Sequence, residues 1–125
     1  QSLAAAWAAA RDAAWDAAVA DIGRIVNVDI ARQQIEGGLV FGMGLALGAA
    51  TGYGQGLPES GRLAALGLPL LADCPEIIVD FIDSTAEPFD PGELGVVAVA
   101  PAIANALFSA IGLRFRRLPL LGDDL

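Results

Sequence analysis

The stretch Gly38-Leu-Val-Phe-Gly42-Met-Gly-Leu-Ala46-Leu-Gly-Ala-Ala50 places a small residue at every fourth position. Residues four apart lie on one face of a helix, so this spacing predicts a helix with a smooth stripe. Each helical glycine lowers stability by roughly 0.5–1 kcal/mol, and burial against a neighbouring element or a ligand is expected to offset that loss. Such a stripe favours helix dimers in membranes, but in a water-soluble domain it indicates tight core packing. We therefore predict a buried, closely packed helix over residues 30–50.

Two further segments predict β-strands. β-Branched residues are dense from Val19 to Val28, which predicts a strand that ends near Asn27. The segment Glu76–Asp83 is the clearest strand in the sequence, because apolar residues form its centre and turn residues flank it. Alternation over Leu113–Leu118 would fit a short edge strand.

Helix boundary signals surround the two helical segments. Asp29 is expected to cap the first helix, since its side chain can accept a backbone N–H of the first turn. Pro101 is expected at the first position of a second helix, residues 101–111, which Gly112 ends. The sequence thus predicts an α+β fold, a small mixed sheet with two main helices, forming a single domain over residues 1–125.

The first 20 residues allow two interpretations. Their alanine content favours a helix, whereas the alternation of Leu3, Ala5, Trp7 and Ala9 favours a strand. Periodicity alone does not decide between them.

Composition excludes several classes of function. There are 15 acidic and 7 basic residues, all arginines, with a net charge of −8 and no histidine. This balance argues against binding to nucleic acid or to an anionic membrane surface. A histidine-based triad cannot be built, and a single cysteine excludes an internal disulfide. The apolar run Leu39–Ala50 is too short for the roughly 20 residues of a membrane span, and no targeting signal is expected in this chain.

Six short segments occur in a characteristic order. They are Asp21–Asn27, Gln34–Gly38, Asp73–Ile77, Gly92-Glu93, Ala100–Ala106 and Arg117–Pro119. Together they resemble the C-terminal part of the large, molybdopterin-binding subunit of the molybdenum hydroxylases, the xanthine dehydrogenase and aldehyde oxidase family. The ending Arg-Arg-Leu-Pro-Leu looks closest to the isoquinoline 1-oxidoreductase large (beta) subunit. The resemblance covers about residues 17–120 and implies a fragment of a larger molybdopterin-binding domain.

The resemblance also implies a reaction and partners. Members of the family hydroxylate a carbon of an aldehyde or an aromatic N-heterocycle, with water as the oxygen donor. Their cofactor is molybdopterin with molybdenum, expected here in its cytosine dinucleotide form, and none is expected to stay bound to the isolated fragment. The implied partners are the rest of the large subunit and an iron–sulfur small subunit. In the family, residues 1–20 would correspond to paired strands, which favours a β-hairpin there.

Four residues match the family's functional positions. Glu93, in the Gly-Glu motif, would be the catalytic base toward a hydroxyl held by the molybdenum. Gln34 would hydrogen-bond the pterin, and the backbone at Gly37 and Gly38 would approach the cofactor closely. The protein would supply no metal ligand, because the cofactor's own sulfurs hold the metal. The family often has proline after this glutamate; here Leu94 follows, so a less rigid loop is expected.

Simpler interpretations stand beside these roles. Glu93 would otherwise be a solvated loop carboxylate, and Gln34 an ordinary surface residue of a helix, with Gln33 beside it as the alternative in register. For the whole chain, the alternative function is a non-catalytic module that self-associates through apolar faces, giving a homo-oligomer of the fragment.

Overall fold

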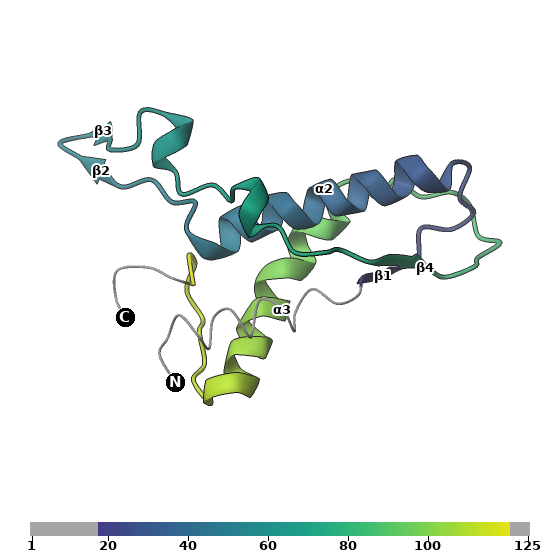
Figure 1. Cartoon of the computed structure of the whole chain (residues 1–125). Coiled ribbons are helices and arrows are strands. Elements are labelled where there is room, and N and C mark those ends of the chain that lie inside the picture. Colours follow the sequence, from purple (N-terminus) through teal and green to yellow (C-terminus); the bar gives the residue numbers. More distant parts are fainter. Residues whose placement is uncertain (1–17, 121–125) are drawn as a thin grey trace.

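Two long helices organise the fold. The structure is a computed structural model, and it describes residues 18–120 (Figure 1). Helix α2 spans Val28–Leu47 and helix α3 spans Leu94–Ile111. Figure 1 shows the two helices crossing at an angle, with the short strands β1 and β4 near the first half of α2. The α+β class with two main helices, predicted from the sequence, is confirmed.

Within residues 18–120, the β-structure consists of two small, separate pairs of strands. Strand β1 (Ala18–Ala20) pairs in parallel with β4 (Val79–Phe81), so that Ala18 faces Val79. Strands β2 (Tyr53–Gly54) and β3 (Leu57–Pro58) form an antiparallel hairpin that projects beyond the end of α2 (Figure 1). Two short 3₁₀ turns, Leu63–Ala65 and Leu71–Asp73, follow this hairpin.

The strand predicted over Val19–Val28 is wrong beyond Ala20. The chain leaves β1 and turns at Gly23, whose φ is +69° and whose Cβ would overlap the carbonyl oxygen of Glu87. Only glycine fits so close to another backbone in this conformation. The second predicted strand is likewise shorter than Glu76–Asp83, and residues 113–118 form no strand. The hairpin predicted over residues 1–20 lies almost entirely outside the described residues.

Helix α2 begins two residues earlier than predicted. Its N-cap is Asn27, whose side-chain oxygen accepts the N–H of Ile30 at 3.0 Å. Asp29, the predicted cap, lies inside the first turn instead, where its negative charge faces the positive end of the helix dipole. Both residues are good caps, and the pattern alone did not distinguish them.

Helix α3 begins seven residues before the predicted start, at Leu94, so Pro101 lies inside it. Proline there has no N–H to donate to the carbonyl of Val97, which lies on an exposed part of the helix. Gly112 ends the helix as predicted, with φ +74° and its N–H donating to Phe108 O at 2.8 Å. The helix therefore begins directly after Glu93, which occupies its N-cap position.

The small-residue stripe of α2 packs against the backbone of α3. A Cβ on Gly42 would lie 2.7 Å from the carbonyl oxygen of Val96, and one on Gly95 would lie 2.5 Å from that of Ile35. A Cβ on Gly38 would lie 3.3 Å from the Cα of Gly95. Ala46, further along the stripe, is fully buried. The prediction of tight packing along this stripe is confirmed for Gly38, Gly42 and Ala46, whereas Ala50 lies exposed beyond the helix.

The core surrounds this crossing. The largest side chains with no exposed area come from α2 (Met43), α3 (Ile103) and β4 (Val79). Other buried apolar residues are Ala20, Ile22, Ala31, Ile35, Leu39, Ala46, Val99, Leu107 and Leu120.

Helix α3 has the length and composition of a membrane span, a property that was not predicted from the sequence. Its 18 residues, Leu94–Ile111, have a mean hydropathy of 2.0 and carry no charge, so by length and composition the helix could cross a membrane. Within this chain, 22% of the helix is buried. A core helix passes the same test, and here Gly95, Val99, Ile103 and Leu107 form its buried face.

The helix crossing predicts opposite effects for two glycines that are both helical. Gly95→Ala should lower the free energy of unfolding by about 1–3 kcal/mol, because the new methyl group overlaps the backbone of α2. Gly37→Ala should raise it by about 0.5–1 kcal/mol, because nothing lies within 4 Å of its Cβ position and alanine favours the helix. Urea unfolding followed by circular dichroism measures both, and a change of the same sign in both variants would contradict the described crossing.

Candidate functional site

An open groove lies beside the helix crossing. Its volume is about 590 Å³, and it runs between α2, from Gln33 to Leu45, and the start of α3. The lining residues are Gln33, Gln34, Gly37, Gly38, Phe41, Leu45, Gly92, Glu93, Val96 and Val97. All four residues predicted from the sequence, Gln34, Gly37, Gly38 and Glu93, thus line one groove.

Gln34 connects the two sides of this groove. It is exposed on the second turn of α2, and its Nε2 donates a hydrogen bond to the carbonyl oxygen of Gly92 at 2.9 Å. The two residues are 58 positions apart in the sequence. An amide side chain has two donors and one acceptor oxygen, so one N–H and Oε1 remain without a partner among the described residues.

The turn before α3 carries Glu93. Gly92 has φ +44°, and its N–H donates to Asp90 Oδ1 at 2.9 Å. The N–H of Leu94 donates to Pro91 O at 2.8 Å, and the carbonyl of Glu93 accepts the N–H of Val96 at 2.9 Å. The turn is therefore closed by hydrogen bonds on both sides of Glu93.

The Glu93 side chain is not used to cap the helix. Glu93 occupies the N-cap position of α3, yet its carboxylate accepts no capping hydrogen bond. The side chain is exposed at the groove. Its carboxylate is thus available to a group that enters the groove, where it can accept a proton or a hydrogen bond.

The adjacent glycines Gly37 and Gly38 face different surroundings. Gly38 is half-buried and needs to be small because Gly95 and Val96 of α3 pack against it. Gly37 is exposed, and no atom lies within 4 Å of the position its Cβ would take. Packing within the described residues therefore explains Gly38 but does not explain why Gly37 lacks a side chain.

Two groove residues of α2, Phe41 and Leu45, were not predicted from the sequence. At a spacing of four they continue a stripe of α2 that begins with Gln33 and Gly37, directly beside the buried stripe of small residues. Phe41 is 62% exposed, and Val97 of α3 is 68% exposed. The spacing of this second stripe could have identified these residues, because two adjacent glycines belong to two different helical faces.

The donor set of the groove suits a planar, heteroaromatic group with a polar edge. Two amide side chains, Gln33 and Gln34, offer donors and acceptors, Gly37 opens the helix backbone, and Phe41 and Val97 give apolar contact. Among residues 18–120 there is no group of three or more His, Cys, Asp or Glu side chains that could hold a metal ion. The residues present therefore fit a pterin better than a bare metal ion.

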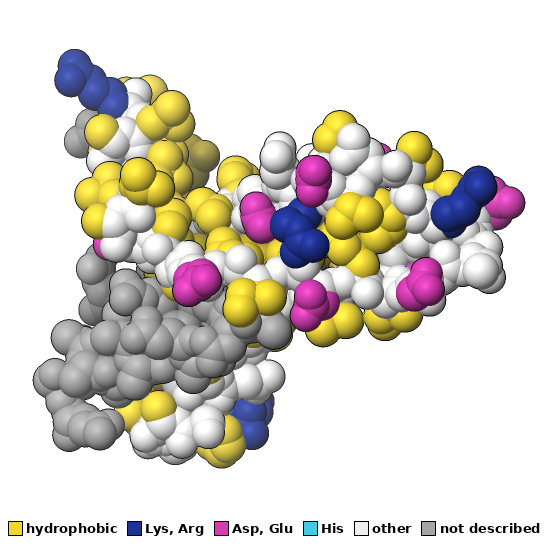
Figure 2. Space-filling view, turned by 45° about the vertical axis from the view of Figure 1, so that its right-hand side comes forward, with side chains coloured by type: hydrophobic (Ala, Val, Ile, Leu, Met, Phe, Trp, Pro, Cys, Tyr) yellow, Lys and Arg dark blue, Asp and Glu magenta, His cyan; other side chains and the backbone are white. Residues whose placement is uncertain are grey.

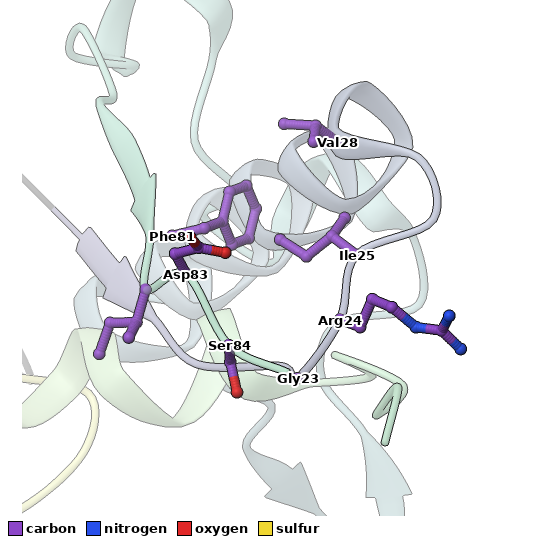
Figure 3. Close-up of a pocket in the computed structure, with 8 residues that line it drawn as sticks. Gly23, Arg24, Ile25, Val28, Phe81, Asp83 and Ser84 are labelled. Carbon is purple, nitrogen blue, oxygen red and sulfur yellow. The ribbon is translucent and has the colours of Figure 1, made fainter. Parts of the chain in front are cut away.

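Two smaller hollows contain fewer of the predicted residues. One of about 320 Å³ lies at the carboxyl ends of β1 and β4, where Ile25 and Phe81 face each other and the Arg24 side chain points outward (Figure 3). It holds none of the four predicted residues. The other, of about 340 Å³, is mostly apolar and shares Gln34 with the main groove. Of these three hollows, all lined by described residues, the main groove is the one that brings Gln34 and Glu93 together.

Comparison with known proteins identifies related proteins. Residues 16–75 match the molybdopterin cofactor-binding domain family. The molybdenum-binding subunit of an Escherichia coli aldehyde oxidoreductase is 38% identical over 116 residues, which cover 86% of this chain and 16% of that protein. The membrane-bound aldehyde dehydrogenase (pyrroloquinoline-quinone) of Gluconacetobacter polyoxogenes is 36% identical over 105 residues, covering 84% of this chain and 14% of that protein. The isoquinoline 1-oxidoreductase subunit beta of Brevundimonas diminuta is 27% identical over 100 residues, covering 80% and 13%.

The fold agrees as well. The CO dehydrogenase from Oligotropha carboxidovorans superposes with a TM-score of 0.72 at 21% identity, over 89% of this chain and 16% of that chain. The family match over residues 16–75 and the molybdenum-binding relatives define the class of protein, the molybdopterin-binding subunits. More narrowly, the chain belongs to the xanthine dehydrogenase and aldehyde oxidase family of molybdenum hydroxylases. It spans only 14–16% of the length of the first relatives it matches.

Proposed function

We propose that the chain is the C-terminal part of a molybdenum hydroxylase large subunit. The reaction replaces a C–H bond of an aldehyde or an N-heterocyclic aromatic compound by C–OH. Water gives the oxygen, and two electrons and two protons leave. That this chain belongs to the family supports the proposed class of reaction. The shared groove of Glu93 and Gln34 supports the role of this segment in it.

Each groove residue has a role in this proposal. Glu93 is the base, which takes a proton from the attacking water-derived oxygen at its exposed carboxylate. Gln34 uses its remaining N–H and Oε1 to orient the pterin edge, while Gly37 and Gly38 let the helix backbone come close to it. When bound, the molybdenum cofactor would supply the two-electron oxidation of the substrate carbon. The exposed apolar side chains Phe41 and Val97 offer apolar contact to a group in the groove.

The cofactor and partners extend beyond the chain. We infer a cytosine dinucleotide form of molybdopterin, held mainly by the rest of the large subunit, and electron transfer to an iron–sulfur small subunit. The isolated chain has too little surface around the groove to retain the cofactor, since its groove is open to solvent. It would therefore be inactive alone.

The single observation that carries the proposal is the bond between Gln34 and Gly92. It joins the residue proposed to contact the pterin to the peptide that precedes the proposed base. Gln34 and Gly92 are 58 positions apart in the sequence, so this contact arises from the tertiary fold and not from neighbouring residues.

Replacing the base tests the reaction. In the complete large subunit, Glu93→Gln should lower kcat at least about 100-fold, because the amide cannot take the proton, with molybdenum content unchanged. Glu87→Gln is the matched control, since Glu87 is exposed on the same loop and lines none of the three hollows. Steady-state kinetics and metal analysis measure both. Full turnover of Glu93→Gln would show that another group is the base.

Filling the groove tests cofactor binding. Gly37→Leu places a side chain where nothing lies within 4 Å of the Cβ position, so the fold should keep its stability. The complete subunit should nevertheless purify with several-fold less molybdenum and pterin, because the side chain occupies the groove. Metal analysis, pterin fluorescence after oxidation and thermal unfolding are the measurements. Normal loading with cofactor would remove Gly37 from the site.

Exposed apolar side chains favour the alternative function, self-association. Large hydrophobic residues are exposed on the segment after α2, including Tyr53 (75%), Leu63 (72%) and Leu71 (91%). Hydrophobic patches also lie between charged side chains on the face shown in Figure 2. A self-associating module should form dimers or larger species whose population rises with concentration in multi-angle light scattering. A monomer at all concentrations would contradict this alternative and leave the rest of the large subunit as the expected cover.

A further inference from the structure

We propose that Asp90 is a positioning residue for Glu93. Its carboxylate accepts the N–H of Gly92 at 2.9 Å, while Gln34 donates to the carbonyl of the same residue at 2.9 Å. Both polar groups of Gly92, which directly precedes Glu93, are thus held by side chains. The inference rests on the proposed function, in which Glu93 is the base.

The backbone hydrogen bonds of the turn hold Leu94 N–H to Pro91 O and Val96 N–H to Glu93 O, and they leave both polar groups of Gly92 to side chains. Gly92 has φ +44° and no atom nearer than 4.0 Å to its Cβ position, so its backbone is not confined by packing. The Glu93 side chain is exposed and makes no capping bond. Asp90 and Gln34 therefore supply the restraint on the Gly92 peptide that the backbone bonds of the turn do not give.

The two side chains restrain different things. Asp90 is two residues from Gly92 and fixes the shape of the turn itself. Gln34 comes from α2 and fixes the turn relative to the helix that forms the other wall of the groove. Removing Asp90 should therefore loosen the turn without changing the residues proposed to contact the cofactor. This makes Asp90 the cleaner residue to test.

The experiment compares side chains of graded ability to accept the Gly92 N–H. Asp90→Asn keeps the acceptor, Asp90→Ser gives a weaker one and Asp90→Ala has none. All are made in the complete, cofactor-loaded large subunit, with Glu87→Ala, an exposed acidic residue of the same loop, as the matched control. Steady-state kinetics, molybdenum content and amide hydrogen exchange of the peptide covering residues 90–96 are measured.

Asp90→Ala should lower kcat about tenfold with KM and molybdenum content unchanged, and amides of the turn should exchange about fivefold faster, as for loss of one hydrogen bond. Asp90→Asn should restore both values, and Asp90→Ser should fall between them. Faster exchange with unchanged kcat would overturn the positioning role, and so would a loss of activity that only follows a loss of molybdenum. Unchanged exchange in Asp90→Ala would overturn the restraint itself.

Failure of this inference can be told apart from failure of the proposed function. If Glu93→Gln keeps full turnover, the base is elsewhere, and the exchange of the turn still tests whether Asp90 restrains it. If Glu93→Gln is inactive while Asp90→Ala turns over normally, the base is correct and the positioning role is wrong.

Discussion

The structure depends on one contact, the place where the backbones of α2 and α3 meet without side chains between them. Gly42 on one helix and Gly95 on the other leave no room for a Cβ, and Gly38 leaves little. A helix pair this close is rigid in register, because sliding either helix would bring a side chain into the contact. Gln34 lies one helical turn before Gly38, and Glu93 lies two residues before Gly95. The same crossing that builds the core therefore brings the two ends of the groove together.

Short sequence patterns correctly predicted features that depend on the backbone geometry of a few neighbouring residues. The spacing of Gly38, Gly42 and Ala46 predicted close packing, and Gly112 predicted a helix end, because both depend on backbone geometry that few residues allow. The start of α3 was predicted wrongly, because the preference of Pro101 for a first turn is weaker than the packing of Gly95 against α2. The strand predicted over Val19–Val28 was too long for a related reason. β-Branched residues favour a strand, but a strand forms only where a partner pairs with it, and β4 pairs with three residues.

The site was predicted in part, through family motifs, and the structure brings those residues together without testing their roles. Motifs identify residues one at a time, whereas the hydrogen bond from Gln34 to Gly92 joins positions 58 apart. Nor does the sequence show that Asp90 holds the Gly92 N–H, because aspartate before Pro-Gly also occurs in ordinary turns. The absence of proline at Leu94 suggested a looser loop. Asp90, which precedes Glu93, and Gln34, on the neighbouring helix, instead hold the two polar groups of Gly92 and so restrain the loop.

The adjacent residues Gly37 and Gly38 meet different requirements: packing of the fold explains Gly38, and the proposed site explains Gly37. Both glycines lower the intrinsic stability of α2, by roughly 0.5–1 kcal/mol each. At Gly38 the close contact with α3 offsets this loss, whereas at Gly37 no contact within the described residues does so. At Gly37, α2 therefore has a lower folding stability, and the missing side chain leaves open space in the groove beside Gln34 and opposite Glu93. That is the pattern expected where a bound group, and not the protein, completes the packing.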